Sequence, residues 1–420
     1  MTQSLTVTGA LIDGALGGVR CVDGVITQLG DGVFALPGDE QIDAGGLSLI
    51  APLVNGHTHA AMTLLRGYGD DLALMEWLET RIWPAESRLT PENVYWGTRL
   101  AALEMIRSGT LRFWDMYFDS TEVARAVSDS GMRACVSQVV INAPGTPATA
   151  KPEASEDGLL ALMESTDLIT PALGPHSIYT LSREDLEHIS ALSDKHNVAI
   201  HMHLSETAGE VANCIDTNKV RPVHYLDALG LVNERSVFAH SIFLDDTELA
   251  VITERGATLV TCPASNMKLA SGGPFRYSHA RRHGCSVGIG TDGASSNNSL
   301  DLFQDIKLLS LLQKHSDGDP SVLPAREALS LASGALAPQL GATPLAVGEQ
   351  ADFLLIDLDS IELTPAPLPE ALIYSATGSC VDTAVVAGRV LMRARIIDGA
   401  DEVLAKAREA AKSVRITNYA

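Results

Sequence analysis

The sequence predicts an α/β protein built on a (β/α)8 TIM barrel, with a small β-sandwich domain that the N- and C-terminal segments form together. Three observations predict this fold. Short apolar segments alternate with amphipathic, helix-period segments through the middle of the chain. Both ends instead show strand-like alternation with frequent turn residues. Polar residues that can bind a metal follow several of the apolar segments.

The two ends of the chain share a strand-and-turn texture. Apolar and polar residues alternate at 5–8 and 24–27 within the first 50 residues, where Gly and Asp are frequent, which predicts short antiparallel strands joined by turns. The same texture returns at 351–358 and 380–393. Because the middle lacks it, we expect both ends to pair into one small sheet domain, with the barrel inserted between them.

This pattern divides the chain into four parts. A segment rich in Ala, Glu and Lys at 401–413 predicts a closing helix. The predicted parts are the β-sandwich, the catalytic barrel, the second part of the sandwich, and a C-terminal helix with its tail: 1–50, 51–344, 345–400 and 401–420, respectively.

Eight apolar runs are the predicted barrel strands. They lie at 49–54, 112–116, 133–140, 168–174, 198–203, 236–239, 258–261 and 286–290. Helix-period segments between them lie at 94–108, 122–130, 183–196, 246–255 and 300–314. Eight strands with intervening helices over roughly 290 residues match the length of a (β/α)8 barrel. A doubly wound open sheet is the alternative, which the motif positions disfavour.

The composition and charge of the chain indicate which kinds of molecule it binds. The chain has 420 residues, 46% of them hydrophobic, and a formal net charge of −22, with no basic run longer than Arg281-Arg282. This charge argues against nucleic acid or a membrane surface and favours a small-molecule substrate. Without a basic and apolar leader or a membrane-length apolar run, we expect a cytoplasmic protein. The six cysteines form no C-x-x-C pair, so we expect neither disulfides nor a thiolate zinc site.

Residues that can bind a metal end four of the predicted strands. The first strand ends in His57-x-His59, the fifth in residues 201–206, the sixth in His240 and the eighth in Asp292. Side chains two apart on a strand point to the same side, and a barrel assembles its active site at the C-terminal strand ends. Imidazoles and a carboxylate suit zinc with a position left for water. The alternative is a set of separate buried histidines and a helix-capping aspartate.

The motifs resemble those of the amidohydrolase superfamily, and more narrowly its methylthioadenosine/S-adenosylhomocysteine deaminase and chlorohydrolase branch. The resemblance runs through essentially the whole chain, including the split β domain. It is carried by residues 52–59, 203–207, 239–240, 263–269 and 290–298. One departure is that Pro52 runs straight into Leu53, where the family usually has a glycine between them, so the strand entry can shift by a residue.

The resemblance implies that His57, His59, His203 and Asp292 bind one divalent ion. Zinc is the first choice, with Fe2+ and Mn2+ as alternatives, because the donor set tolerates all three. His201 is then a neighbour of the ligands. The bound ion would lower the pKa of a water from about 15.7 to about 7.

The resemblance also implies the chemistry, which is hydrolytic deamination of a cyclic amidine. Asp292 accepts the proton of the attacking water, Glu206 protonates the ring nitrogen, and His240 orients the nucleophile and stabilises the developing charge. An alternative role for Glu206 is to cap the helix after the fifth strand.

Four residues are predicted to bind the substrate. Trp77 can cover a flat purine, and Glu86 can accept two hydrogen bonds from the vicinal ribose hydroxyls, as the matching glutamate does in nucleoside deaminases that the sequence resembles. His176 matches a substrate-binding histidine of the family, and Ser296 can bond to the purine. The alternative for Glu86 is a solvated loop carboxylate.

The third strand bears on the substrate. Relatives that take a carboxylate-tailed substrate can carry an arginine there, and residues 134–140 contain none. We therefore expect adenosine, 5′-methylthioadenosine or 5′-deoxyadenosine to be preferred over S-adenosylhomocysteine. The alternatives are deamination or dechlorination of a free heterocycle (8-oxopurine, guanine or s-triazine) and a non-catalytic scaffold. Homo-oligomerisation stays open.

Overall fold

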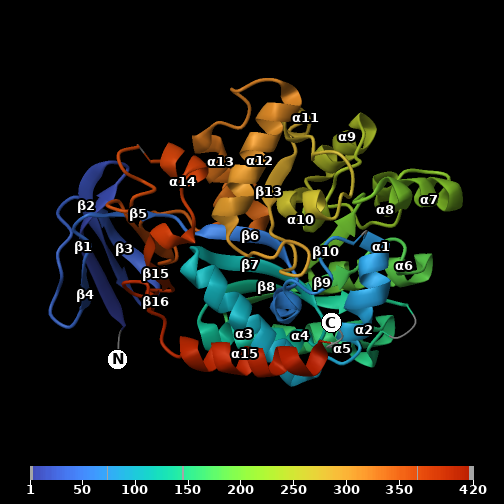
Figure 1. Cartoon of the computed structure of the whole chain (residues 1–420), viewed down its shortest axis with the longest axis horizontal. Coiled ribbons are helices and arrows are strands. Elements are labelled where there is room, and N and C mark those ends of the chain that lie inside the picture. Colours follow the sequence, from blue (N-terminus) through green and yellow to red (C-terminus); the bar gives the residue numbers. More distant parts are fainter. Residues whose placement is uncertain (1–2, 73, 144–145, 367, 416–420) are drawn as a thin grey trace.

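A computed structural model describes residues 3–72, 74–143, 146–366 and 368–415. It confirms the predicted fold, because eight parallel strands form a barrel and a second sheet is built from both ends of the chain (Figure 1). The barrel strands are β6 (Leu53–Thr58), β7 (Thr110–Tyr117), β8 (Arg133–Val140), β9 (Ile169–Pro175), β10 (Ala199–Leu204), β11 (Ser236–His240), β12 (Thr258–Thr261) and β13 (Ser286–Ile289).

The seam between the first and last barrel strands is closed largely by one side chain. Asn55 of β6 accepts a hydrogen bond from the Thr291 N–H (3.0 Å) and donates to Thr291 Oγ1 (2.7 Å). The Asp292 N–H also donates to the His57 carbonyl oxygen at 3.0 Å. These bonds satisfy buried polar groups and hold the residues that follow β13 against the end of β6.

The second sheet joins the two ends of the chain, as predicted. Its strands are β1 (Ser4–Ile12), β2 (Ala15–Val22), β3 (Val25–Gly30), β4 (Glu40–Asp43), β5 (Leu47–Ile50), β14 (Phe353–Asp357), β15 (Val381–Val386) and β16 (Arg389–Met392). The antiparallel pair of β5 and β14 joins the ends. The expected antiparallel pairing is confirmed for β1 with β2 and for β2 with β3, whereas β1 pairs with β4 and β5 in parallel.

The expected barrel strand at 49–54 is also wrong, since two strands share that segment. β5 ends at Ile50 in the small sheet, and β6 begins at Leu53 in the barrel. Pro52 lies between them and has no N–H for a strand ladder, so the chain crosses from one sheet to the other there. The other seven predicted barrel strands agree with the structure to within two residues.

The five predicted helices between the strands are confirmed: α3 (Pro91–Arg107), α4 (Ser120–Ser130), α6 (Arg183–His196), α9 (Asp246–Arg255) and α12 (Leu302–Asp317). So is the closing helix, α15 (Ala400–Val414), which lies along α3 (Figure 1). The structure adds helices that were not predicted: α1 (Leu74–Trp77), α2 (Trp83–Glu86), α5 (Ser155–Met163), α7 (Ala208–Asn218), α8 (Pro222–Ala228), α10 (Pro263–Lys268), α11 (Tyr277–Arg282), α13 (Ala325–Ala332) and α14 (Glu370–Tyr374).

Short turns of helix complete the fold. They are η1 (Ala60–Leu65), η2 (Leu78–Ile82), η3 (Ala148–Ala150), η4 (Pro152–Ala154), η5 (Pro338–Leu340) and η6 (Gly378–Cys380). Within the part of the chain that the structure describes, no helix combines the length and apolarity needed to cross a membrane.

A buried ion pair joins the barrel to the small sheet. The Arg133 guanidinium, at the start of β8, donates to both oxygens of Asp352 at 2.7 and 3.2 Å. Asp352 directly precedes β14 and also accepts from the Ala387 N–H at 2.8 Å. This fork of bonds fixes the sheet at the end of β8 opposite to the catalytic rim. The domain limits themselves stay predictions.

Candidate active site

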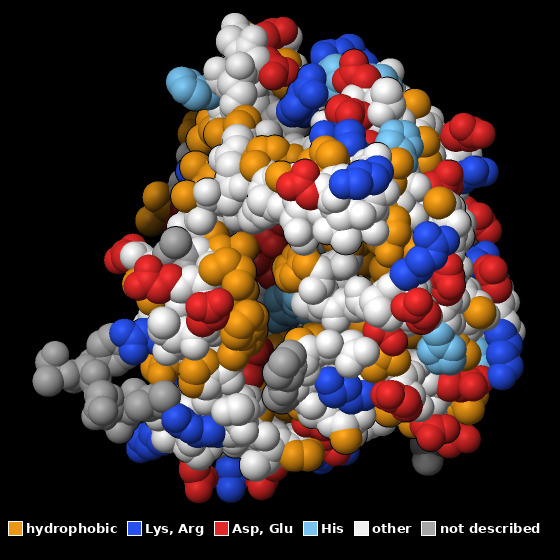
Figure 2. All heavy atoms as spheres, turned by 90° about the vertical axis from the view of Figure 1, so that its right-hand side faces the viewer, with side chains coloured by type: hydrophobic (Ala, Val, Ile, Leu, Met, Phe, Trp, Pro, Cys, Tyr) orange, Lys and Arg blue, Asp and Glu red, His pale blue; other side chains and the backbone are white. Residues whose placement is uncertain are grey.

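The predicted metal-binding residues meet at the C-terminal rim of the barrel. His57 and His59 lie at the end of β6, His203 on β10, His240 at the end of β11, and Asp292 shortly after β13. The face of the molecule in Figure 2 is hollowed near its middle, with a histidine side chain visible at depth and apolar side chains around the opening. Parallel strands converge at this rim, so residues far apart in sequence become neighbours.

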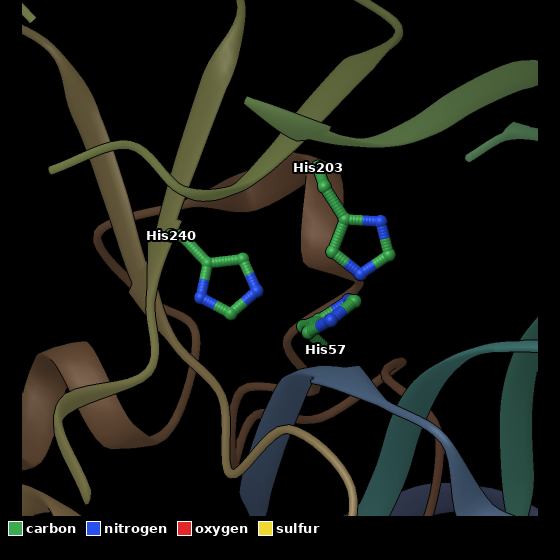
Figure 3. Close-up of side chains that lie close together, drawn as sticks. All are labelled: His57, His203 and His240. Carbon is green, nitrogen blue, oxygen red and sulfur yellow. The ribbon is translucent and has the colours of Figure 1, made fainter. Parts of the chain in front are cut away.

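The potential ligand atoms are close enough to share one ion. Asp292 Oδ1 lies 3.3 Å from His59 Nε2 and 3.5 Å from His57 Nε2. His203 Nε2 lies 3.2 Å from His59 Nε2. His240 also borders this group, because its ligand atom and those of His57 and His203 all lie within 4.8 Å of one another (Figure 3).

Backbone carbonyls set the tautomers of two of these histidines. His59 Nδ1 donates to the Met116 carbonyl oxygen at 2.6 Å, and His203 Nδ1 donates to the His176 carbonyl oxygen at 2.8 Å. Because a carbonyl can only accept, each Nδ1 must carry the proton. Each Nε2 therefore presents a lone pair to the shared space, which is the arrangement that a metal ligand needs.

His57 has a different second partner. Its Nδ1 lies 2.9 Å from His201 Nε2, and His201 Nδ1 lies 3.1 Å from Ser137 Oγ. A neutral His201 that accepts from His57 carries its own proton on Nδ1 and donates it to Ser137. His57 Nε2 is buried and makes no hydrogen bond with the described residues. A buried nitrogen without a hydrogen bond, close to other potential ligand atoms, fits the role of a metal ligand.

The environment keeps the imidazoles of His57 and His203 neutral. Burial lowers the pKa of His57 to about 4, and the neighbouring His59 contributes to this shift. Burial and the adjacent histidines, His176 first, hold the pKa of His203 well below its ordinary value. Neutral imidazole is the form that binds metal, so both groups are ready to bind near pH 7 without losing a proton.

Asp292 is held as a carboxylate in a left-handed backbone conformation (φ 61°). Its Oδ2 accepts hydrogen bonds from Ser265 Oγ (2.6 Å) and Ser296 Oγ (2.8 Å), which leaves Oδ1 for the imidazoles. Burial alone would raise the pKa of Asp292, but the facing His57 and neighbouring histidines hold it well below the usual range. The Ser296 hydroxyl is thus engaged with Asp292, and its contact with a purine stays a prediction.

Glu206 and His240 lie beside the ligands. Glu206 is buried, and its N–H and that of Ser205, which has a φ of 48°, donate to the two oxygens of Glu210 at 2.9 and 2.8 Å. His240 Nδ1 donates to Asn266 Oδ1 at 2.8 Å. Although burial lowers the pKa of His240, Glu206 and Asp292 raise it above its ordinary value overall. An imidazole and a carboxyl group that can transfer protons thus adjoin the metal-binding group.

The other predicted substrate residues differ in how near they lie to the ligands. Glu86 is half-buried and accepts a hydrogen bond from the Tyr117 hydroxyl at 2.9 Å, and burial raises the pKa of Glu86 to about 7. The His176 ring centroid lies 4.5 Å from that of His203. Trp77 is buried and lines a small cavity together with Asp70 and other residues of the neighbouring loops. Their contacts with a substrate stay predictions.

Sequence reasoning missed the residues that support the site. In the 263–269 motif, Ser265 bonds to Asp292, Asn266 bonds to His240, and Lys268 Nζ donates to Asp70 Oδ1 at 2.6 Å and to Asn298 Oδ1 at 3.0 Å. These three residues could have been found from the position of their motif, which directly follows the seventh predicted strand at the catalytic rim. Glu210 and Ser137 carried no such signal.

Comparisons with known proteins agree on one family. The amidohydrolase family model matches residues 48–391. The chain is 42% identical over 375 residues to the 5′-deoxyadenosine deaminase of Methanoregula boonei, covering 88% of this chain and 85% of that one. It is 40% identical over 385 residues to the 5-methylthioadenosine/S-adenosylhomocysteine deaminase of Pelotomaculum thermopropionicum, covering 90% and 88%. Its structure matches an adenosine deaminase from Xanthomonas campestris with bound zinc at a TM-score of 0.90 and 32% identity, covering 98% of each chain.

Proposed function

The chain belongs to the amidohydrolase family, and on that premise we propose that it is a metal-dependent hydrolase that deaminates an adenosine-type nucleoside to the inosine analogue and ammonia. One observation carries the proposal. Three imidazole Nε2 atoms and Asp292 Oδ1 converge at the C-terminal rim of the barrel, next to His240, on which Glu206 acts electrostatically. The names of the relatives, 5′-deoxyadenosine deaminase and 5-methylthioadenosine/S-adenosylhomocysteine deaminase, supply the substrate class.

We assign the metal to His57, His59, His203 and Asp292. Zinc is the first candidate, because three neutral imidazoles and a carboxylate suit it and the Xanthomonas campestris neighbour binds it. Fe2+ and Mn2+ are compatible with the same donors. When bound, the ion would make hydroxide available near neutral pH, by lowering the pKa of water from about 15.7 to about 7.

The protein's own side chains then have separate tasks. Asp292 Oδ1 lies among the ligands and can accept the proton of the attacking water, while Ser265 and Ser296 hold its other oxygen. Glu206 donates a proton to the ring nitrogen next to the carbon that is attacked. His240, aligned by Asn266, orients the nucleophile and stabilises the developing negative charge. Asp292 then passes its proton to the amino group, so that the C–N bond breaks and ammonia leaves, while the proton of the new hydroxyl group returns to Glu206.

The nucleoside is bound around the opening. Glu86 accepts two hydrogen bonds from the vicinal ribose hydroxyls, and Tyr117 positions its carboxylate. We assign Trp77 and His176 to further contacts with the nucleoside. The net charge of −22 favours a free nucleoside over a nucleic acid as the substrate. We further infer that the enzyme works in the cytoplasm.

The 5′ end is predicted to be small. An arginine fork that pairs with a carboxylate tail is absent from 134–140, and Arg133 on the same strand is occupied by Asp352 at the other end of the barrel. Adenosine, 5′-methylthioadenosine and 5′-deoxyadenosine are therefore preferred over S-adenosylhomocysteine.

The test is a panel assay on metal-replete protein, with ammonia release as the readout. The panel holds adenosine, 5′-deoxyadenosine, 5′-methylthioadenosine, S-adenosylhomocysteine, adenine, guanine, 8-oxopurine and an s-triazine. We expect the highest kcat/KM among the first three compounds. Glu206→Gln should abolish turnover and keep nucleoside binding.

Three results would contradict the proposal in different ways. Turnover of free bases alone would favour a heterocycle deaminase and remove the role of Glu86. Comparable kcat/KM for S-adenosylhomocysteine and methylthioadenosine would refute the 5′ preference. Less than about half an equivalent of metal per chain after metal-supplemented expression would favour a non-catalytic scaffold.

A further inference from the structure

A second histidine cluster lies outside the barrel mouth, on the outer layer of helices. Asp246 is the first residue of α9, and His279 and His283 lie on α11 and directly after it. α9 and α11 lie in this outer layer on the same side of the barrel (Figure 1). Neither the resemblance nor the proposed reaction gives these residues a role.

Helix geometry brings the two imidazoles together. The His283 N–H donates to the His279 carbonyl oxygen at 3.2 Å, so the two residues are one helical turn apart on the same face. Their ring centroids lie 5.1 Å apart. Two histidines four residues apart on a helix are a recurrent way to bind a divalent metal through both rings.

Asp246 completes a three-donor set. Its Oδ1 accepts a hydrogen bond from His279 Nε2. One ligand atom from each of Asp246, His279 and His283 lies within 4.8 Å of the other two. The Asp246 side chain is 65% exposed, so an ion held here would keep water ligands and would be reached directly from solvent.

From this geometry we infer that Asp246, His279 and His283 form a second divalent-metal site, which takes Zn2+ or a similar borderline ion such as Ni2+ or Cu2+. Two imidazoles and one carboxylate are the donor types that such ions share. Binding replaces the proton between His279 and Asp246 with the metal ion. The site is independent of the proposed deaminase activity.

A neighbouring arginine limits the affinity. Arg282 NH2 lies 3.2 Å from His279 Nδ1, on the ring whose other nitrogen faces Asp246. Its positive charge opposes a second cation, and its N–H occupies the nitrogen that must carry the proton when Nε2 binds a metal. The surface site is therefore weaker than the buried one, and removing Arg282 should strengthen it.

The test is a Zn2+ titration by calorimetry. Full-length protein with its buried site loaded is passed over a chelating resin to strip weakly held ions, and Zn2+ alone is then added. We expect one further equivalent to bind, with a Kd of roughly micromolar order. His279→Gln and His283→Gln should each weaken this step by at least about tenfold, since even loss of a supporting partner of a ligand costs that much.

Two further variants sharpen the result. Arg282→Gln should bind the second Zn2+ more tightly, and His188→Gln, which removes an exposed histidine on α6, should leave it unchanged. Near-UV circular dichroism checks that each variant is folded. Absence of a second equivalent in the native protein, or binding of native affinity in both His279→Gln and His283→Gln, would overturn the inference. These outcomes do not depend on whether the protein deaminates nucleosides.

Discussion

At the barrel mouth His59 and His203 each donate to a backbone carbonyl, whereas on the outer surface His279 Nδ1 faces the Arg282 guanidinium. Both clusters combine imidazoles with one carboxylate. The first is assembled from the ends of several barrel strands, and the second from two neighbouring helices. The difference lies in the groups behind the ligands: carbonyl oxygens leave the Nε2 lone pairs of His59 and His203 free for a metal, whereas Arg282 faces the nitrogen of His279 that must carry the proton when its Nε2 binds a metal.

Preorganisation is what this comparison teaches. Burial keeps the pKa of His57 near 4 and that of His203 well below its ordinary value, so the buried ligands need neither deprotonation nor reorientation. The exposed ligands must first lose a shared proton and order their side chains. The same donor types should therefore bind metal strongly in one place and weakly in the other.

The largest expected effect comes from removing one buried ligand. His203→Gln leaves three donors, and the metal should be lost on chelator treatment that the native protein survives. Nucleoside turnover should fall by at least roughly a thousandfold, because free water has a pKa of about 15.7 against about 7 when metal-bound. The matched surface variant, His279→Gln, should keep full turnover. Metal analysis and kcat/KM on both variants check this, and equal losses would break the comparison.

The next largest effect is expected from the residues behind the ligand His57, which are His201 and Ser137. His201→Phe deprives His57 Nδ1 of its partner and should weaken metal binding by about 10- to 100-fold, while kcat at saturating metal changes less. Competition with a chromophoric chelator measures the affinity. Ser137→Ala, which removes the partner of His201, should weaken metal binding less than His201→Phe does. An unchanged affinity in His201→Phe would show that the tautomer of His57 is fixed in another way.

Sequence patterns predicted the parts of the site that depend on one strand at a time. Periodicity and strand order placed the strand-end candidates at one rim of the barrel, and the resemblance then selected His203, not its neighbour His201, as the ligand on the fifth strand. The division at Pro52 was missed because an apolar run shows no boundary between two sheets.

The supporting residues could not be predicted in the same way. The bonds from Asn266 to His240 and from Lys268 to Asp70 join loops that are far apart in sequence, and their partners follow only from the closed barrel. The surface cluster was missed for the same reason. His279 and His283 are visible as a helical pair, but Asp246 lies 33 residues before His279.

The KM for the nucleoside should depend on pH through Glu86. Burial raises the pKa of Glu86 to about 7, and only its ionised form accepts hydrogen bonds from both ribose hydroxyls. KM should therefore rise as the pH falls, roughly tenfold from pH 8 to pH 6, which spans one unit on each side of that pKa. Steady-state kinetics with 5′-deoxyadenosine measures this.

Two variants test the assignment of this pH effect. Glu86→Gln should raise KM and make it independent of pH in this range. Tyr117→Phe removes a hydrogen bond that lowers the pKa of Glu86, so the midpoint should move to higher pH. A KM profile that is the same in Glu86→Gln as in the native enzyme would assign the titration to another group.

The smallest expected effect lies in the contact between the loops that border the opening. Lys268 and Asn298 both bond to Asp70, at 2.6 and 2.8 Å, and thereby tie the loop that carries Trp77 to the loops after β12 and β13. About a quarter of the Lys268 side chain and a third of that of Asp70 are exposed, so solvent screens this ion pair. Lys268→Met should raise KM only a few-fold, in line with about 1 kcal/mol or less for such pairs.

Asp70→Asn and the double variant complete a mutant cycle, in which the two changes should be less than additive on KM and leave metal content unchanged. Additive effects would mean that the loops are positioned independently, and loss of metal would mean that the contact supports the buried cluster as well as the opening.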